Sequence, residues 1–344
     1  MAPAVASGPS IFEPAAGSLV GTTVLITGAN TGLGLESSKR LYAAGANIIV
    51  TARSMQKAQD AVSKVKASYA GSDAGSLVAL DLDLADLASV RSFPSRLKTA
   101  VGKGDDAPPP IEVLLNNAGV MAIPERLETT NGFERTLGVN HLGHFALVAA
   151  LMPSLKRAKG GFRIINVSSD AHKLANKDAV ESALKADLDP EYSQWGNYAV
   201  SKAANVLFTA ELQRRFDAAG VAGSAVSLHP GMVQTDLPRY IVGGVGAGDT
   251  RLSETAPPPP TSGPGAFLKA NLLDKVVLPI DAGANTQVYL AAAADSADGG
   301  RARVKGVYYD GMKMVKPADY ALDASLAKKL WDVSERLTGA KIEP

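Results

Sequence analysis

The sequence predicts an α/β fold in which a doubly wound parallel sheet of about seven strands carries helices on both faces. Short β-branched and apolar runs alternate along the chain with longer helical patterns. These runs are apolar almost throughout, whereas a half-exposed strand would be apolar only at every second residue. Such strands are typical of a parallel sheet covered on both faces, and right-handed crossovers then give a Rossmann-like arrangement.

The first strand is expected at 22–28, where β-branched residues end at a glycine. The other strands are expected at 47–53, 76–83, 111–119, 162–169, 223–231 and 306–311. Helices are expected at 33–44, 55–68, 86–100, 131–156, 195–218, 282–294 and 322–337.

Two segments, 170–194 and 236–278, interrupt this alternation. Both follow strand ends, where ligands bind in such sheets, and long loops there are often functional. We expect a single domain over 21–344 with these two insertions as substrate loops, preceded by an extended arm over 1–20.

Composition excludes several kinds of protein. The 344 residues carry a net charge of +1, so a nucleic-acid partner is not expected. The chain has no cysteine, which removes disulfides, thiol nucleophiles and Cys-ligated zinc, and agrees with the cytoplasm or another reducing compartment. No apolar run reaches the roughly 18 residues of a membrane helix. The N-terminus lacks the pattern of a signal peptide.

The stretch "TGANTGLG" joins the first expected strand to the first helix, with glycines in a G-x-x-x-G-x-G pattern. Gly28 permits a sharp exit from the strand, Gly32 lets the backbone approach a pyrophosphate, and Gly34 lets the helix pack close to the sheet. The free N–H groups at the helix start would face the phosphates. A glycine-rich turn without a ligand is the alternative, but this position in the fold favours a dinucleotide. The expected turn comprises Gly28, Asn30, Thr31, Gly32, Leu33 and Gly34.

The second expected strand ends in "VTAR" and bears on the choice of cofactor. An NAD site would place an acidic residue about 20 residues after the glycines, to bind the ribose 2′-hydroxyl. No acid lies between Asn47 and Arg53, and the guanidinium of Arg53 suits a 2′-phosphate. NADP(H) is therefore expected in preference to NAD(H), although Arg53 could also be a solvated strand-end charge.

Tyr198 and Lys202 stand four residues apart in "YAVSK", which places them on one face of a helix. The spacing alone arises often by chance. With "TGANTGLG", "LDLADLASVRSF", "NNAG", "GVNHLGHF", "INVSS" and "HPGMVQTDL" in order, the chain resembles the short-chain dehydrogenase/reductase family from Thr22 to the C-terminus. "SSDAH" and "LAKKLWDVSERLTG" resemble its retinol-dehydrogenase-like branch.

The resemblance implies a role for each member of a catalytic tetrad. Tyr198 would be the general acid in reduction and the base in oxidation. Lys202 would lower the pKa of Tyr198 and bind the nicotinamide ribose. Ser169 would hydrogen-bond the substrate oxygen, and Asn140 would support a water-mediated proton path to Lys202. A tyrosine with an ordinary pKa near 10 needs such help to transfer protons near neutrality.

The resemblance also implies further cofactor contacts. Asp83 would hydrogen-bond the adenine amino group, and residues 117–119 and 230–235 would line the adenosine and nicotinamide sides. These residues are Asn117, Ala118, Gly119, Pro230, Gly231, Val233 and Thr235. No metal site is expected, because the pair His141 and His144 lacks acidic partners and is better explained by helix packing. Trp195 fits a substrate wall or ordinary packing equally well.

The expected function is NADP(H)-dependent interconversion of a carbonyl and a hydroxyl on a lipophilic small molecule. The alternative is a non-catalytic NADP(H)-binding regulatory or scaffold protein, against which the complete tetrad counts. Isomerisation or dehydration on the same fold is a third option. Family members often pair through the helices that contain Asn140 and Tyr198, so a homodimer is a further expectation, although monomers occur in this branch.

Overall fold

The computed structural model describes residues 10–71, 74–101, 107–233, 278–293 and 308–344. Their strands form one eight-stranded sheet in the order β3-β2-β1-β4-β5-β6-β7-β8. All pairings are parallel except that of β7 with β8. The strands are β1 Thr23–Ile26, β2 Asn47–Ala52, β3 Leu77–Asp81, β4 Val113–Asn116, β5 Phe162–Val167, β6 Gly223–His229, β7 Tyr308–Asp310 and β8 Lys313–Val315.

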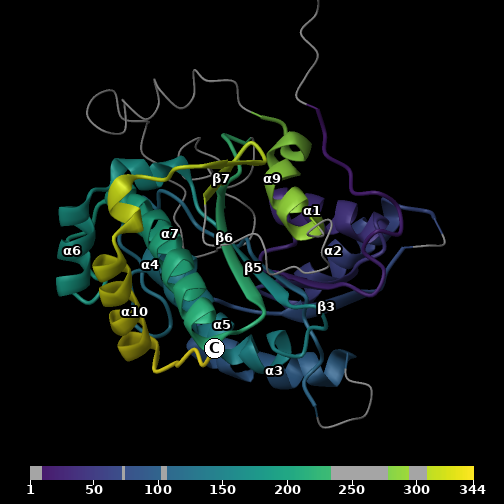
Figure 1. Ribbon diagram of the computed structural model, residues 1–344, viewed down its shortest axis with the longest axis horizontal. Coiled ribbons are helices and arrows are strands. Elements are labelled where there is room, and N and C mark those ends of the chain that lie inside the picture. The colour runs from purple at the N-terminus through teal and green to yellow at the C-terminus, as the bar shows by residue number, and fades with distance from the viewer. Residues whose placement is uncertain (1–9, 72–73, 102–106, 234–277, 294–307) are drawn as a thin grey trace, which may run out of the picture.

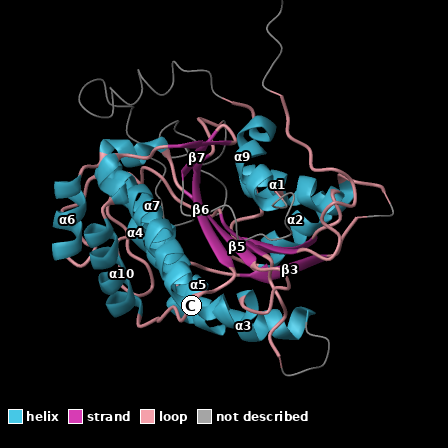
Figure 2. Cartoon of the chain, viewed as in Figure 1, coloured by secondary structure: helices cyan, strands magenta, loops and turns pink. Residues whose placement is uncertain are grey.

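The strand order reverses between β1 and β4, which is the point where such sheets bind ligands. Helices cover both faces of the sheet, and the predicted fold class is confirmed (Figures 1 and 2). The sequence did not predict the short antiparallel strand β8.

Two apolar cores lie on opposite faces of the sheet. One face carries α1 Gly32–Ala43, α2 Met55–Ala67 and α9 Ile280–Ala292. The other carries α3 Leu87–Val101, α5 Gly143–Leu155 and α7 Gln194–Ala219, with α6 Lys177–Lys185 and α10 Ala324–Thr338 packed outside α7 (Figure 1).

The helix predicted over 131–156 begins later and is interrupted. It starts at α4 Arg135–Leu137, because the buried carboxylate of Glu134 accepts the free N–H groups of Thr136 at 2.8 Å and Leu137 at 2.9 Å. One wider, π-helical turn over Gly138–Leu142 then precedes α5. Such turns are often found at functional sites, and this one carries Asn140.

The segment 170–194, expected as a long loop, contains regular structure. A 3₁₀ turn, η2 (Asp170–Leu174), is followed by α6, whose first turn is capped by Asn176 through a 2.8 Å bond from Ala179 N. The predicted helix 195–218 corresponds closely to α7, which begins after the cap Ser193 and ends at Gly220 with φ +64°. A further 3₁₀ turn, η6 (Asp319–Leu322), precedes α10.

The described part of the expected N-terminal arm packs against α9. Asn285 accepts a bond from Phe12 N at 2.9 Å and donates one to Ser10 O at 2.8 Å. The ring of Phe12 meets that of Tyr289 edge to face at 5.4 Å. The substrate loop expected at 236–278 lies outside the described residues except at its end. Within the described ranges, no helix is both long and apolar enough to span a membrane.

Candidate active site

The glycine turn follows β1 at the carboxyl edge of the sheet. Gly28 has φ +63°, and a Cβ there would meet Ala118 Cα at 3.0 Å. A Cβ on Gly34 would lie 2.6 Å from both Asn117 Nδ2 and Gly28 O. The absence of side chains therefore lets the start of α1 sit against the end of β4, as the spacing predicts. Thr31 precedes α1 with extended backbone, φ −154°.

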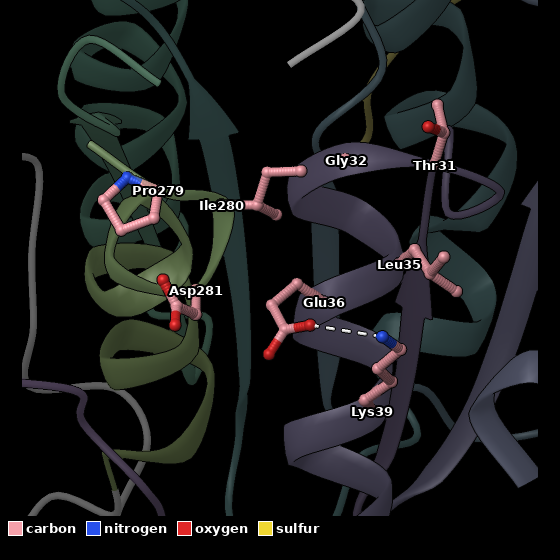
Figure 3. A pocket seen from close by; sticks show the side chains of 8 residues that line it. All are labelled: Thr31, Gly32, Leu35, Glu36, Lys39, Pro279, Ile280 and Asp281. Atoms are coloured by element: carbon pink, nitrogen blue, oxygen red, sulfur yellow. Dashed lines mark hydrogen bonds and ion pairs between the residues drawn. The ribbon is translucent and has the colours of Figure 1, made fainter. Parts of the chain in front are cut away.

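A cleft of about 600 Å³ opens beside this turn, between the first turns of α1 and α9 (Figure 3). Of the predicted cofactor residues, Thr31 and Gly32 line it, together with side chains of α1 and α9. Val233 lies nearby, because a Cβ on Gly283 of α9 would meet Val233 Cγ2 at 2.4 Å and Leu33 Cδ2 at 3.1 Å. The positive φ of Gly28 and the close packing at Gly34 suit a backbone cradle for a pyrophosphate.

The end of β4 is joined to the glycine turn by Thr27, a residue that the sequence analysis missed. Its Oγ1 accepts bonds from Asn117 N and Ala118 N, both at 2.9 Å. Oγ1 also lies 2.9 Å from His144 Nε2, and His144 Nδ1 lies 3.1 Å from Asn140 O. Since a carbonyl only accepts, Nδ1 carries the proton and Thr27 donates to Nε2. Thr27 thus connects the cofactor-side turn to the helix of Asn140.

Burial keeps both histidines of this helix neutral. It lowers the pKa of His144 to about 4 and that of His141 to about 3, where the charge of His144 adds to the effect. His141 Nε2 lies 2.8 Å from Ser334 Oγ of α10, which itself donates to Leu330 O at 2.7 Å. Both side chains therefore hold the helix in place, in agreement with the packing interpretation.

Asn140 lies in the π-helical turn with its side chain fully buried. Its Oδ1 accepts a bond from Val120 N at 2.8 Å, and its Nδ2 donates to Val120 O at 2.9 Å and to Ser201 Oγ at 3.0 Å. Ser201 in turn donates to Tyr198 O at 2.8 Å. The amide therefore joins the chain after Gly119 to the turn of α7 that carries Tyr198.

Ser169, Tyr198 and Lys202 meet where β5 and the first turns of α7 adjoin. Lys202 Nζ donates to Val167 O at 3.0 Å and lies 5.7 Å from the centre of the Tyr198 ring. The side chain of Ser169 lies close enough to the Tyr198 hydroxyl to act on its pKa. Ser168 instead donates to Lys202 O at 2.7 Å, so the geometry supports Ser169 rather than Ser168 as the substrate-side hydroxyl.

Burial shifts the pKa values of both members of the pair. Burial raises the pKa of Tyr198 to about 12, and only the neighbouring Ser169 acts in the lowering direction. Burial also lowers the pKa of Lys202 to about 8. Desolvation of the phenolate therefore dominates, and the lowering of the tyrosine pKa expected from Lys202 stays a prediction.

The other predicted cofactor residues lie along the same edge. Arg53 follows β2 directly and is exposed, and Asp83 follows β3 with its Oδ1 accepting Ala85 N at 2.9 Å. Pro230 and Gly231 follow β6. Val233 forms a bridge with Leu278, so the two described ends around 234–277 meet beside α9. Thr235 lies outside the described residues.

Comparisons with known proteins agree with this arrangement. The short chain dehydrogenase family model matches residues 22–186. Retinol dehydrogenase 13 of Homo sapiens is 36% identical over 326 residues, covering 95% of this chain and 87% of that protein. This chain belongs to the short-chain dehydrogenase family. The predicted likeness to the retinol-dehydrogenase-like branch is confirmed.

Two further members extend the comparison. Polyprenol dehydrogenase of Mus musculus is 37% identical to this short-chain dehydrogenase over 326 residues, covering 93% of this chain and 84% of that protein. The crystal structure of an uncharacterised protein from Mycobacterium Paratuberculosis is 30% identical, with a TM-score of 0.66 and coverage of 97% of this chain and 100% of that one. The overall fold is thus shared with a solved structure.

Proposed function

We propose that this chain is an NADP(H)-dependent oxidoreductase that interconverts a carbonyl and a hydroxyl on a lipophilic small molecule. The observation that carries the proposal is the position of Tyr198, which is buried beside Ser169 and close to Lys202. This group lies at the same edge of the sheet as the glycine turn. Few arrangements other than proton transfer to an oxygen would use a buried phenol beside a hydroxyl and an amine.

The cofactor would be held by residues at the switch point of the sheet. Gly28, Gly32 and Gly34 would accommodate the pyrophosphate, and Asp83 and Asn117 would lie on the adenosine side. The nicotinamide would supply or accept the hydride. Arg53 supports NADP(H), since an exposed guanidinium directly after β2 suits a 2′-phosphate.

The protein's own groups would manage the proton. With a pKa of about 12, Tyr198 carries its proton at neutral pH, and it would donate that proton to the carbonyl oxygen as negative charge develops there. Ser169 would donate a hydrogen bond to the same oxygen. Lys202, with a pKa of about 8, is mostly charged at pH 7 and would favour the phenolate left behind.

An apolar wall beside Tyr198 supports a lipophilic substrate. Met121 and Ala122 form a buried cluster with Tyr198, and Trp195 packs against it. Two relatives are named as dehydrogenases of retinol and of polyprenol, and both of these alcohols are lipophilic. A homodimer through α5 and α7 stays a prediction. Against it, α10 already covers part of that surface, since Trp331 packs on Phe145 and Phe208.

The test is NADPH oxidation with a panel of carbonyl compounds of graded chain length, with Tyr198→Phe compared at saturating substrate. Loss of the donor is expected to lower kcat by roughly 10²- to 10⁴-fold. The NADPH dissociation constant, measured by calorimetry, should stay unchanged. Tyr289→Phe is the matched control, because that ring packs on Phe12 away from Tyr198. NADPH binding without turnover of any compound would support the non-catalytic alternative, and full turnover by Tyr198→Phe would remove the proton-donor role.

A further inference from the structure

His172 lies three residues after Ser169, in η2, and its side chain is fully buried. Both ring nitrogens have backbone partners. Nδ1 lies 2.7 Å from Ser169 O, and Nε2 lies 3.1 Å from Ala318 N. A carbonyl only accepts and an amide only donates, so Nδ1 carries the proton and Nε2 is the acceptor. The ring is therefore neutral and bridges Ser169 to a residue far away in the sequence.

Other residues of the C-terminal segment contact His172 and its neighbour Asp170. Tyr320 donates its hydroxyl proton to His172 O. The ring of Tyr308 meets the imidazole edge to face at 4.8 Å, and its hydroxyl lies 3.3 Å from Asp170 Oδ1. Asp170 also pairs with Lys173 at 2.7 Å. Ordering the turn after β5 thus depends on residues of β7 and η6, which follow much later in the chain.

These contacts leave Ser169 little freedom. Its carbonyl accepts both the imidazole Nδ1–H and the backbone N–H of His172, the latter at 3.0 Å. Its Oγ accepts Ala171 N at 3.1 Å while the backbone stays extended, with φ −164°. Ala171 N thus engages one lone pair of Oγ, and the hydroxyl lies close enough to Tyr198 to act on the pKa of the phenol.

We propose that His172 is a positioning residue for Ser169: it carries the constraint from Ala318 in the C-terminal segment to the hydroxyl that orients the substrate oxygen. This inference rests on the proposed function, in which Ser169 contacts that oxygen. Outer residues that hold a reactive group in place commonly change activity by 10- to 100-fold when removed, at least at metal sites, where this has been characterised best.

Three substitutions of His172 distinguish the contribution of its bond to Ser169 from that of its bond to Ala318. His172→Phe keeps an aromatic ring and removes both hydrogen bonds. His172→Asn offers an amide N–H near the place of Nδ1, and His172→Gln offers an amide oxygen near the place of Nε2. If the bond to Ser169 matters most, Asn should retain more turnover than Gln, and Phe should retain least. Ala321→Gly is the control, because it loosens the same segment at a fully buried methyl and leaves both bonds of His172 in place.

The decisive measurement is a double-mutant cycle with Ser169→Ala, followed by kcat and KM on a carbonyl that the wild type reduces. His172→Phe is expected to lower kcat by about 10- to 100-fold in the wild-type background. In the Ser169→Ala background it should lower kcat less than about twofold, because the group that it positions is already gone. The midpoint of thermal unfolding should fall equally in both backgrounds, and calorimetric NADPH affinity should not change.

Equal losses of kcat in both backgrounds, or a loss shared by Ala321→Gly, would overturn the positioning role and leave the proposed function standing. Absence of turnover in the wild type across the whole panel would instead overturn the proposed function, and this inference with it.

Discussion

Two halves of the sheet hold their candidate functional groups by different means. In the cofactor half, β1 to β4 with α1 to α3, the expected residues lie in turns fixed by neighbouring strands, as when Thr27 binds Asn117 and Ala118. In the proton half, β5 to β8 with α5, α7 and α10, the C-terminal segment secures the groups, through Ala318 to His172 and Ser334 to His141. The glycine turn is thus held by β4 and by α9, from which Gln287 donates to Leu33 O at 3.0 Å, whereas the proton-transfer groups are secured by residues that follow β8.

The largest effect that would test this division is expected from Trp331→Ala. Trp331 is 1% exposed and packs on Phe145 at 5.2 Å and Phe208 at 5.9 Å between ring centres, with Arg215 stacked on it at 4.0 Å. Truncation should cost about 3–5 kcal/mol of unfolding free energy, measured by denaturant titration.

Trp331→Phe, which preserves most of the packing, is the control and should cost less. Where the Ala variant is still folded, we expect kcat to fall while NADPH affinity is retained. An equal fall in NADPH affinity would show that the two halves are not separable in this way.

Gly34→Ala should mainly weaken cofactor binding, in contrast to the substitution of Trp331. The new methyl would meet Gly28 O at 2.6 Å, and backbone cannot yield as a flexible side chain can. We expect a cost of about 1–3 kcal/mol, expressed mainly as weaker NADPH binding in calorimetry. Gly339→Ala is the control for destabilisation alone, since φ +65° at the end of α10 strains any side chain there, and it should leave NADPH affinity unchanged. Unchanged NADPH affinity would contradict the cradle assigned to this turn.

Acid should destabilise the fold through two buried histidines. His141 and His144, with pKa values of about 3 and 4, stay neutral in the folded protein while the unfolded chain takes up protons below its pKa of about 6.5. Their contribution is thus present above pH 6.5 and is lost as pH falls toward 4, by roughly 1.4 kcal/mol per pH unit for each histidine.

Denaturant unfolding at pH 7 and pH 5 measures this loss, and His141→Gln should show a shallower dependence than the wild type. An identical dependence in both proteins would exclude His141 as one of its sources.

The smallest expected effect concerns cofactor choice. Arg53→Ala should weaken NADPH binding about tenfold, or about 1.4 kcal/mol, because an exposed charge pair contributes little more, and should leave NADH binding unchanged. Lys159→Ala removes an equally exposed positive charge just before β5, at the opposite edge of the sheet, and serves as the control. A parallel loss of NADH affinity would show that Arg53 does not distinguish the two cofactors.

Much of the fold could be predicted because its signals are local. Each of the strands β1 to β6 is a short apolar run. The helix α7 has a serine cap at one end and a glycine at the other, so adjacent residues suffice to predict these elements. The start of the helix before Asn140 was placed too early, because the cap is a buried glutamate, Glu134, rather than the usual short polar residue. The 3₁₀ turn and α6 were missed, since their stability comes from packing on α7 and α10.

By itself, the sequence determined the doubly wound sheet, the glycine turn, and the spacing of Tyr198 and Lys202 on one helix. Backbone geometry and hydrophobic periodicity repeat over a few residues and need no knowledge of distant partners. Only the tertiary structure decided that Tyr198 would be buried deeply enough to raise its pKa to about 12. It alone paired His172 with Ala318, and His141 with Ser334. Desolvation and long-range hydrogen bonds depend on which segments the fold brings together, and a short stretch of sequence does not predict those contacts.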